Sequence, residues 1–411
     1  MSRRLASAIV VLSGMVLVTS LAAPAQAMTP PAVPAGDAVA PSTSRSTLPA
    51  RVTTRLDAAL MAGWGGLPGG ATAGMWVPGQ GRWVGSVGLA NVETGRPMVP
   101  RLQIPIGSST KPFTATLVLQ EVAAGRLSLD DRLSAWFPEI PRSEEITIAM
   151  LLNMSSGIAD FANGDIVKLI TTLIADPQTR FAPDDLIAQG AAMPRAFDVP
   201  GSQFSYSNTN TVILGRILEK STGATYESLL TTRLFQPLGL TRTILDLDGD
   251  LQSPNAQTYS EVFSIDPEGA PIGRTTDWSN SWAWSAGALA STIHDLRDWG
   301  RTLGTGAGAL SPETAALRLS DCMPASQTET ITMDYCLGLV ADRRKDTGEV
   351  ITLWHNGQVF GAVSYVGYYP ATGAVVVVQA NSDVTDADDR SAATRVRAAI
   401  QAAVPRLLGL G

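Results

Sequence analysis

Residues 106–113 read Ile-Gly-Ser-Ser-Thr-Lys-Pro-Phe, which places Ser108 three positions before Lys111. Side chains three positions apart on a helix point the same way, so the Lys111 amine can polarise the Ser108 hydroxyl. A serine activated in this manner is a candidate covalent nucleophile. The chain has four lysines, and only Lys111 has a serine three positions earlier. The simple alternative is a helix N-terminus, with Ser108 near the cap and Lys111 in solvent.

A second string, Tyr206-Ser207-Asn208, is the only Y-x-N in the chain. It follows a turn signal at Pro200-Gly201 and precedes a helical pattern that runs to about Lys220. Gly223 stands where a helix stop is expected. The string therefore lies at the start of a predicted helix. A packed aromatic at Tyr206 and a simple helix cap at Asn208 are the structural alternatives.

A third string, His355-Asn356-Gly357, lies between two apolar segments, residues 350–354 and 361–365. This pattern predicts a strand, a turn at the histidine string and a second strand. The structural alternative for His355 is a turn histidine. The other histidine, His294, is interpreted as structural or surface-exposed.

In this order the three strings resemble the serine β-lactamase and D-alanyl-D-alanine carboxypeptidase family. The likeness is greatest to its class C and low-molecular-weight DD-peptidase branch, whose motifs are S-x-x-K, Y-x-N and H-x-G in place of K-T-G. Other segments similar to the family are residues 91–97, 125–131, 205–223, 235–240 and 284 onward. The resemblance implies an α+β fold in which an antiparallel sheet is flanked by helices and a mostly helical lobe is inserted.

The resemblance also implies a role for each motif residue. Ser108 would form an acyl-enzyme, and either Lys111 or Tyr206 would take its proton. His355 would supply hydrogen bonding or charge on the other side of the site. The oxyanion would be held by the backbone N–H groups of Ser108 and Gln358. The candidate substrate-binding residues are Asn208, Trp284, Gly357 and Gln358. No metal and no cofactor are implied.

Three departures from the family pattern affect specificity. Residues 154–157 read Met-Ser-Ser-Gly in place of the frequent His-Thr-Ser-Gly. Asn356 and Gln358 stand where close DD-peptidase relatives have threonine. The arginine that holds the substrate carboxylate in those relatives would directly follow Leu339, but this position is Val340, and arginines come only at 343 and 344. We therefore expect weak DD-carboxypeptidase activity relative to hydrolysis of acyl compounds without a carboxylate.

The function that these motifs predict is an exported serine hydrolase acting on D-alanyl peptides, β-lactams or related acyl compounds. Its substrate would be a small molecule or a peptidoglycan-type peptide. One alternative is an esterase on small acyl esters that uses the same site. The alternative from another class is a non-catalytic penicillin-binding or cell-wall-binding relative.

The N-terminal segment predicts export. Residues 1–27 combine Arg3 and Arg4, an apolar run over 8–21 and Ala-Gln-Ala at 25–27, which is typical of a signal peptide. Residues 28–50 are rich in Pro, Ala, Ser and Thr, and they are interpreted as a linker. The hydrolase domain would span 51–411, with an α/β lobe at about 51–125 and 281–411 and a helical lobe at about 126–280. The mature protein would be secreted, without a membrane span.

Charge and cysteine content narrow the function further. Removal of residues 1–27 leaves 28 basic and 37 acidic residues, a net charge of −9. This balance argues against nucleic-acid partners and anionic membrane surfaces. The only cysteines, Cys322 and Cys336, are predicted to form a disulfide in an exported protein, with two buried thiols as the alternative. The two histidines lie far apart and form no zinc motif.

Hydrophobic periodicity places the main elements. Apolar spacing predicts a helix over 110–125 and a covering helix over 392–404. A hairpin is expected at the start of the domain, and several strands at its end. These ends have few partner strands in the middle of the chain, so we expect them to pair in one sheet. The predicted strands are 73–77, 82–89, 337–341, 351–354, 362–369 and 374–379.

Overall fold

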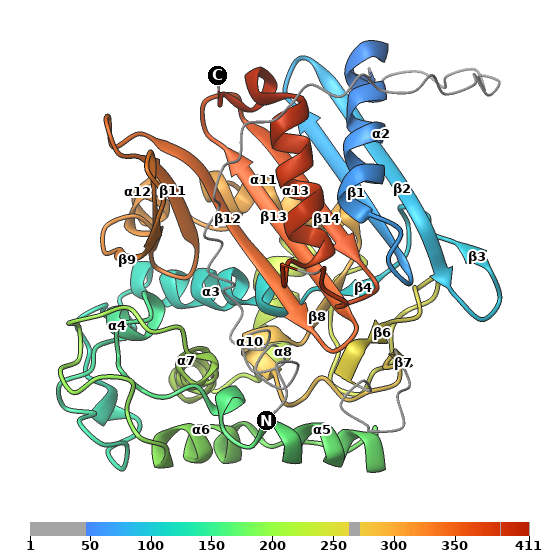
Figure 1. Ribbon diagram of the computed structural model, residues 1–411. Coiled ribbons are helices and arrows are strands. Elements are labelled where there is room, and N and C mark those ends of the chain that lie inside the picture. Colours follow the sequence, from blue (N-terminus) through green and yellow to red (C-terminus); the bar gives the residue numbers. More distant parts are fainter. Residues whose placement is uncertain (1–46, 263–271, 387, 411) are drawn as a thin grey trace.

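The computed structural model describes residues 47–262, 272–386 and 388–410 (Figure 1). The predicted signal peptide and the first part of the predicted linker lie outside the described residues. The end of that linker is packed: Leu48 is buried, and its N–H donates to the Arg82 carbonyl at 3.0 Å. Leu48, three residues before the predicted domain start at position 51, therefore already packs against the domain.

One antiparallel sheet joins the two ends of the chain, as the sequence predicts. Strand β1 of the N-terminal hairpin pairs directly with β14 near the C-terminus, with Ala73 opposite Val378. Among the described residues the sheet has nine strands. Their order is β3 (Arg96–Pro97), β2 (Gly81–Asn91), β1 (Gly70–Val77), β14 (Ala374–Ala380), β13 (Ala362–Tyr369), β12 (Val350–Val359), β11 (Val340–Arg344), β10 (Ile331–Tyr335) and β9 (Met323–Gln327).

Helices cover both faces of this sheet. Helices α2 (Ala50–Trp64) and α13 (Ala392–Ala403) pack against each other on one face, and α11 (Ile293–Thr305) packs on the other (Figure 1). Because side chains alternate along a strand, β14 contributes Val375 and Val377 to one core and Val376 and Val378 to the other. Burial on both faces explains why this strand is a continuous apolar run.

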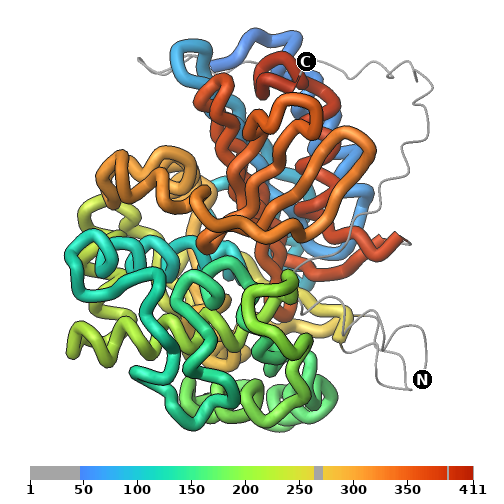
Figure 2. The backbone as a smooth tube through the Cα atoms, turned by 90° about the vertical axis from the view of Figure 1, so that its left-hand side faces the viewer, coloured from blue at the N-terminus to red at the C-terminus, as the bar shows by residue number. Residues whose placement is uncertain are grey.

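A mostly helical lobe is inserted between β2–β3 and the C-terminal strands, and it lies below the sheet in both views (Figures 1 and 2). Its helices are α3 (Lys111–Ala123), α4 (Ile148–Leu152), α5 (Ile166–Ala175), α6 (Pro183–Ala192), α7 (Asn208–Thr222), α8 (Tyr226–Leu230), α9 (Gln236–Leu238) and α10 (Trp284–Gly287).

The remaining described elements are short. One is helix α12 (Pro312–Leu317), which follows α11. The others are the helical segments η1 (Gly107–Thr110), η2 (Leu133–Ala135), η3 (Phe161–Asn163), η4 (Thr231–Phe235) and η6 (Pro405–Leu408), and the strands β4 (Ile104–Pro105), β5 (Ile244–Leu245), β6 (Tyr259–Ser260), β7 (Gly273–Arg274) and β8 (Leu289–Ser291).

The ends of helices α3 and α7 are set by residues that favour a helix start or a helix stop. Helix α3 has Pro112 in its first turn, where the missing N–H costs no hydrogen bond. Helix α7 ends at Gly223, which adopts the left-handed conformation with φ 71°, as the sequence predicts. Among the described residues, no helix is both long and apolar enough to cross a bilayer.

Two strand predictions were wrong. The chain does not turn at His355-Asn356-Gly357, because β12 continues to Val359 and the turn comes at Phe360-Gly361. The predicted strand 337–341 is shifted, since β11 begins at Val340. Strands β9 and β10 were not predicted. They lie at the sheet edge, are largely half-exposed and carry polar residues, so their hydrophobic signal is weak.

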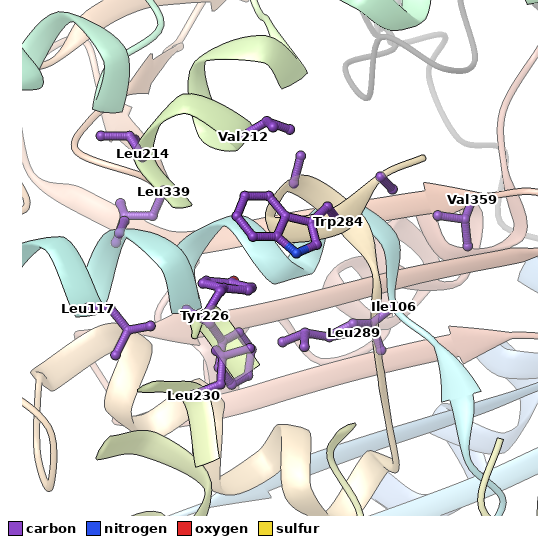
Figure 3. Close-up of a cluster of buried hydrophobic side chains, with 14 of the residues drawn as sticks. Ile106, Leu117, Val212, Leu214, Tyr226, Leu230, Trp284, Leu289, Leu339 and Val359 are labelled. Atoms are coloured by element: carbon purple, nitrogen blue, oxygen red, sulfur yellow. The ribbon is translucent and has the colours of Figure 1, made fainter. Parts of the chain in front are cut away.

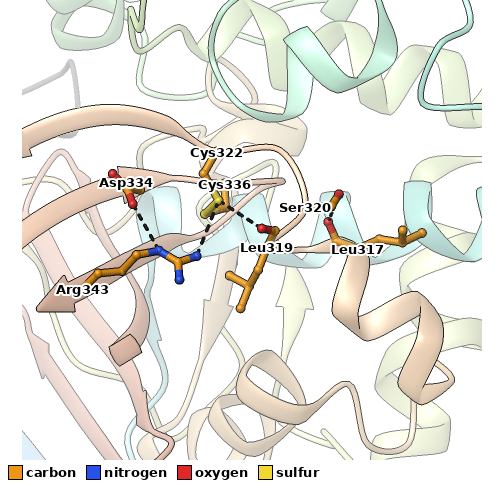
Figure 4. Close-up of a disulfide and its surroundings, with 7 residues drawn as sticks. All are labelled: Leu317, Leu319, Ser320, Cys322, Asp334, Cys336 and Arg343. Carbon is orange, nitrogen blue, oxygen red and sulfur yellow. Dashed lines mark hydrogen bonds and ion pairs between the residues drawn. A yellow bond between two sulfur atoms is a disulfide. The ribbon is translucent and has the colours of Figure 1, made fainter. Parts of the chain in front are cut away.

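The structure contains the predicted disulfide between Cys322 and Cys336 (Figure 4). Cys336 directly follows Tyr335, the last residue of β10, and Cys322 precedes β9. The bond therefore closes the base of the β9–β10 hairpin and fixes the position at which Tyr335 leaves it.

Replacing both cysteines by serine is expected to lower the free energy of unfolding by about 3 kcal/mol, because the crosslink restricts a loop of about 15 residues in the unfolded chain. Denaturant unfolding of the two proteins measures the difference. Two alkylatable thiols in the native protein, detected by mass spectrometry, would contradict the assignment.

Candidate active site

Ser108 lies at the seam between the sheet and the helical lobe. It is the second residue of η1, which leads directly into α3, and it is buried. Segment η1 rests on strand β12. The Ser364 hydroxyl contacts Ser109 Oγ at 2.7 Å and donates to the Ile106 carbonyl at 2.6 Å. These hydrogen bonds hold the serine-bearing turn against the sheet.

Two glycines allow η1 and β12 to approach closely. A Cβ atom at Gly107 would lie 2.4 Å from the Gln358 nitrogen, and one at Gly357 would lie 1.8 Å from the Ile106 oxygen and 2.8 Å from the Ser108 nitrogen. Gly107 also has a positive φ of 53°, which disfavours other residues. Gly357 therefore serves close backbone packing in the middle of a strand. This approach brings the backbone N–H groups of Ser108 and Gln358 into one region.

The Lys111 amine is buried and contacts three oxygen atoms. Its Nζ lies 2.9 Å from Ser108 Oγ, 2.6 Å from Asn208 Oδ1 and 2.8 Å from the Ala286 carbonyl. These partners come from η1, from the first residue of α7 and from α10. The alternative of a solvent-exposed lysine is excluded, because Lys111 is only 1% exposed.

A buried carboxylate lies behind this amine. Asp160 caps η3 by accepting a hydrogen bond from the Ala162 N–H at 3.0 Å. Its two carboxylate oxygens also lie 2.9 and 3.2 Å from Asn208 Nδ2, which donates to them. An amide nitrogen donates and an amide oxygen accepts. Asp160 therefore fixes the orientation in which Asn208 presents Oδ1 to Lys111.

Burial sets the protonation of this pair. It lowers the pKa of Lys111 to about 7, while the charge of Asp160 acts in the opposite direction. Burial also raises the pKa of Asp160 to about 6, against hydrogen bonds from Ala162 and Asn208 and the charge of Lys111. Burial therefore favours the neutral form of the Lys111 amine.

Tyr206 remains a phenol in this setting. Burial, and next the neighbouring Tyr335, raise its pKa well above the ordinary value, while Ser108 acts in the opposite direction. The Tyr206 hydroxyl lies beside Ser108 without full hydrogen-bond geometry, and Lys111 Nζ is 4.9 Å from the ring centre. Of the two candidate bases, Lys111 is the one whose unprotonated form is favoured by burial, because the unprotonated form of Tyr206 would be a buried phenolate.

His355 contributes hydrogen bonding and not charge. Burial, and then the charge of Lys111, lower its pKa to about 3. Its Nδ1 lies 2.6 Å from the Asn356 carbonyl, which can only accept, so Nδ1 carries the hydrogen. Its Nε2 therefore accepts from the Tyr335 hydroxyl at 3.0 Å. Tyr335 in turn packs edge-on against Tyr206, with ring centres 6.0 Å apart.

The side chain of Trp284 is placed in the hydrophobic core (Figure 3). It is buried, and its ring lies 5.2 Å from that of Tyr226. Two residues later in α10, the Ala286 carbonyl accepts from Lys111. Trp284 is thus placed as a core residue on the helix whose Ala286 carbonyl contacts Lys111.

The two arginines after Val340 are engaged by acids. Arg343 pairs with Asp334 at 3.2 Å, as Figure 4 shows, and Arg344 pairs with Glu349 at 3.8 Å. The first pair joins β11 to β10, and the second lies at the turn between β11 and β12. Each guanidinium therefore already has an acidic neighbour, and the Arg343 pair is the closer and less exposed of the two.

Three site groups were missed by the sequence analysis: Asp160, Tyr335 and the Ala286 carbonyl. Asp160 follows Gly157 by three residues, and its position next to an apolar turn carried no catalytic signal. Tyr335 belongs to an unpredicted strand, and a backbone carbonyl leaves no sequence signal.

His294 lies on α11, and its ring centre is 6.4 Å from that of Trp76. Within the described ranges, no cluster of three or more His, Cys, Asp or Glu residues is arranged to hold a metal.

Comparison with known proteins places this site in a family. The family model described as Beta-lactamase matches residues 28–401. Penicillin-binding protein 4 of Amycolatopsis lactamdurans is 31% identical over 294 residues, which cover 68% of this chain and 72% of that protein. The chain therefore belongs to the Beta-lactamase family, and it is a serine hydrolase with the α+β fold predicted from its motifs.

Two further relatives carry names that refer to D-amino acids. A D-stereospecific amidohydrolase from a Streptomyces species has a solved structure that matches with a TM-score of 0.72 and 26% identity, over 85% of this chain and 98% of that one. The D-aminopeptidase of Brucella anthropi is 32% identical over 154 residues, which cover 37% of this chain and only 28% of that protein.

Replacing Asp160 by asparagine is expected to move the acid limb of the pH profile of kcat/KM to lower pH. The Asp160 charge raises the pKa of Lys111, so its loss lets the neutral amine form at lower pH. Asp246→Asn is the matched control, because Asp246 is a buried carboxylate with a raised pKa that accepts from Asn280, outside this site. An acid limb that stays in place in Asp160→Asn would show that the carboxylate does not act on Lys111.

Proposed function

We propose that this protein is an acyl-serine amidohydrolase that acts on D-aminoacyl amides, esters and short peptides whose leaving group lacks a free carboxylate. The observation that carries the proposal is the buried contact of Lys111 with Ser108, combined with the acidic partners of Arg343 and Arg344. The first supports acyl transfer, and the second argues against a terminal carboxylate. The names of the Streptomyces and Brucella relatives support a D-amino acid on the acyl side.

Acylation would begin at the neutral form of Lys111. Its two N–H groups donate to Asn208 Oδ1 and the Ala286 carbonyl, and its lone pair then faces the Ser108 hydroxyl. Lys111 takes the hydroxyl proton as Ser108 Oγ attacks the substrate carbonyl. The resulting oxyanion would be held by the N–H groups of Ser108 and Gln358, which lie together because Gly107 and Gly357 permit the close packing of η1 on β12.

Collapse of the tetrahedral intermediate requires a proton on the leaving nitrogen. Tyr206 is a phenol beside Ser108, so it would donate its proton to the leaving group and regain one from Lys111. The C–N bond breaks, the amine departs, and Ser108 retains the acyl group as an ester. Water then attacks this ester with the same groups acting in reverse, which releases the acid and restores Ser108.

Specificity would depend on the amide side chains of β12. Asn356 Oδ1 and Gln358 Nε2 are buried and have no hydrogen-bond partner among the described residues. One is an acceptor and the other a donor, so together they match a substrate amide group. A hydroxyl pair at these positions would suit a carboxylate better. We expect these side chains to contact the substrate on the side of the oxyanion.

We also infer that the protein is exported. The support is the signal-peptide pattern of residues 1–27 and the Cys322–Cys336 disulfide, which is typical of oxidising compartments. A peptidoglycan-type peptide is then an accessible substrate.

Ser108→Ala is expected to abolish covalent labelling by a fluorophosphonate or a fluorescent penicillin while the fold is kept, because one hydroxyl oxygen is the only heavy atom lost. Gel fluorescence and intact-protein mass measure the label. Labelling that persists at another serine would overturn the assignment of the nucleophile. Labelling without any turnover of D-aminoacyl substrates in the unmodified enzyme would favour the non-catalytic alternative.

Capping the C-terminal carboxylate of a D-alanyl-D-alanine peptide as an amide or methyl ester should change kcat/KM by less than about threefold, which is below 1 kcal/mol. The reason is that Val340 replaces the arginine of the DD-peptidase pattern, and Arg343 and Arg344 already have acidic partners. Steady-state kinetics on the capped and uncapped pair, with D- and L-alanyl p-nitroanilides beside them, provide the measurement. A loss above about a hundredfold on capping, roughly 2.7 kcal/mol, would demonstrate a carboxylate anchor.

A further inference from the structure

A cavity of about 700 Å³ lies on the α11 side of the sheet, apart from the Ser108 site. Its walls are the β1–β2 turn, the middle of α11 and the turn between β13 and β14. None of the residues that contact Lys111 or Ser108 lines it. Its size falls within the usual range of small-molecule sites. The lining residues that matter here are Trp76, Arg82, Arg297, Asp298, Arg301 and Tyr368.

Positive charge is concentrated in this cavity. Arg297 is neutralised by Asp298, to which its Nε donates at 2.8 Å. Arg82 and Arg301 have no ion pair and no side-chain hydrogen bond among the described residues. Two unpaired guanidinium groups therefore face one cavity in a chain whose formal net charge is −7. Like charges held together repel each other, and a bound anion relieves this repulsion.

The cations are held on rigid elements. Arg297 and Arg301 are four residues apart on α11, so they share one face of the helix. The helix lies close to the sheet, because a Cβ at Gly300 would be 2.6 Å from Val375 Cγ1 and one at Gly304 would be 2.1 Å from Tyr368 Cδ1. The backbone positions from which Arg297 and Arg301 extend are thus fixed by the packing of α11 on the sheet.

Aromatic rings form the apolar part of the walls. The Trp76 ring lies over Gly74 of its own strand, where a Cβ would approach it to 2.3 Å, and Tyr368 lies under α11. Since guanidinium nitrogens only donate, the unpaired Arg82 and Arg301 side chains around the cavity call for a ligand rich in acceptors.

We propose that this cavity binds an organic phosphate, a phosphate monoester attached to a flat apolar group. A phosphate monoester carries a charge of about −2 near neutral pH, which matches the two unpaired guanidinium groups. Arginine binds phosphate through two parallel N–H donors. The flat group would pack on Trp76 and Tyr368. This site is independent of the acyl-transfer chemistry of Ser108.

Calorimetric titration of the Ser108→Ala protein with phenyl phosphate tests the proposal, because this variant cannot form an acyl-enzyme. We expect saturable 1:1 binding that is the same in the unmodified protein. Arg82→Ala and Arg301→Ala should each weaken binding at least about tenfold. Arg301→Lys should also weaken it, since it keeps the charge but loses the paired donors. Inorganic phosphate and phenylacetate should bind more weakly than phenyl phosphate.

Arg101→Ala is the matched control, because it removes one exposed positive charge that does not line the cavity. Its affinity for phenyl phosphate should equal that of the parent protein. Absence of saturable binding at millimolar phenyl phosphate would overturn the proposal. Equal weakening by Arg101→Ala and Arg301→Ala, or loss of binding after Ser108 of the unmodified enzyme is acylated, would overturn it as well. Thermal unfolding of every variant checks that the fold is kept.

Discussion

The burial of the Lys111 amine is the interaction on which the rest of the site depends. Removing an amine from water is costly unless it is hydrogen-bonded, and here three oxygen atoms surround it. These oxygen atoms belong to η1, α7 and α10, so the three segments must meet at one point. The same burial lowers the pKa of Lys111 to about 7 and makes it able to take a proton. Packing of the lobe and chemistry of the site are therefore consequences of one arrangement.

The seam between sheet and helical lobe supplies the second constraint. Backbone atoms of η1 and β12 approach so closely that only glycine fits at 107 and 357. On the other side, the Tyr335–His355 hydrogen bond ties β10 to β12 and places Tyr335 against Tyr206. The disulfide at Cys336 holds the end of β10 where this contact is made. The edge hairpin thus supports the site, although it contributes no group that contacts Ser108.

The proposed determinants of substrate specificity surround the catalytic groups and are not part of them. The amine, the serine and the phenol would serve any acyl transfer, and their arrangement alone does not select a leaving group. In our proposal, selection depends on the amides of Asn356 and Gln358 and on the charge of nearby arginines. Because Arg343 and Arg344 already have acidic partners, the amide groups would take the place of a cationic anchor. This difference underlies the proposed preference for substrates without a carboxylate.

The sequence by itself determined the features that arise from short separations along the chain. The Ser108–Lys111 spacing, the helix start at Asn208, the first hairpin and the final helix all follow from periodicity and turn residues, and the structure confirms these elements. The tertiary structure alone decided that β12 passes straight through His355, that Asp160 and Tyr335 join the site, and that His355 is neutral. Asp160 and Asn208 are 48 positions apart, and Lys111 and Ala286 are 175 apart. Burial and hydrogen bonding between such distant segments set the pKa values, and no local pattern encodes them.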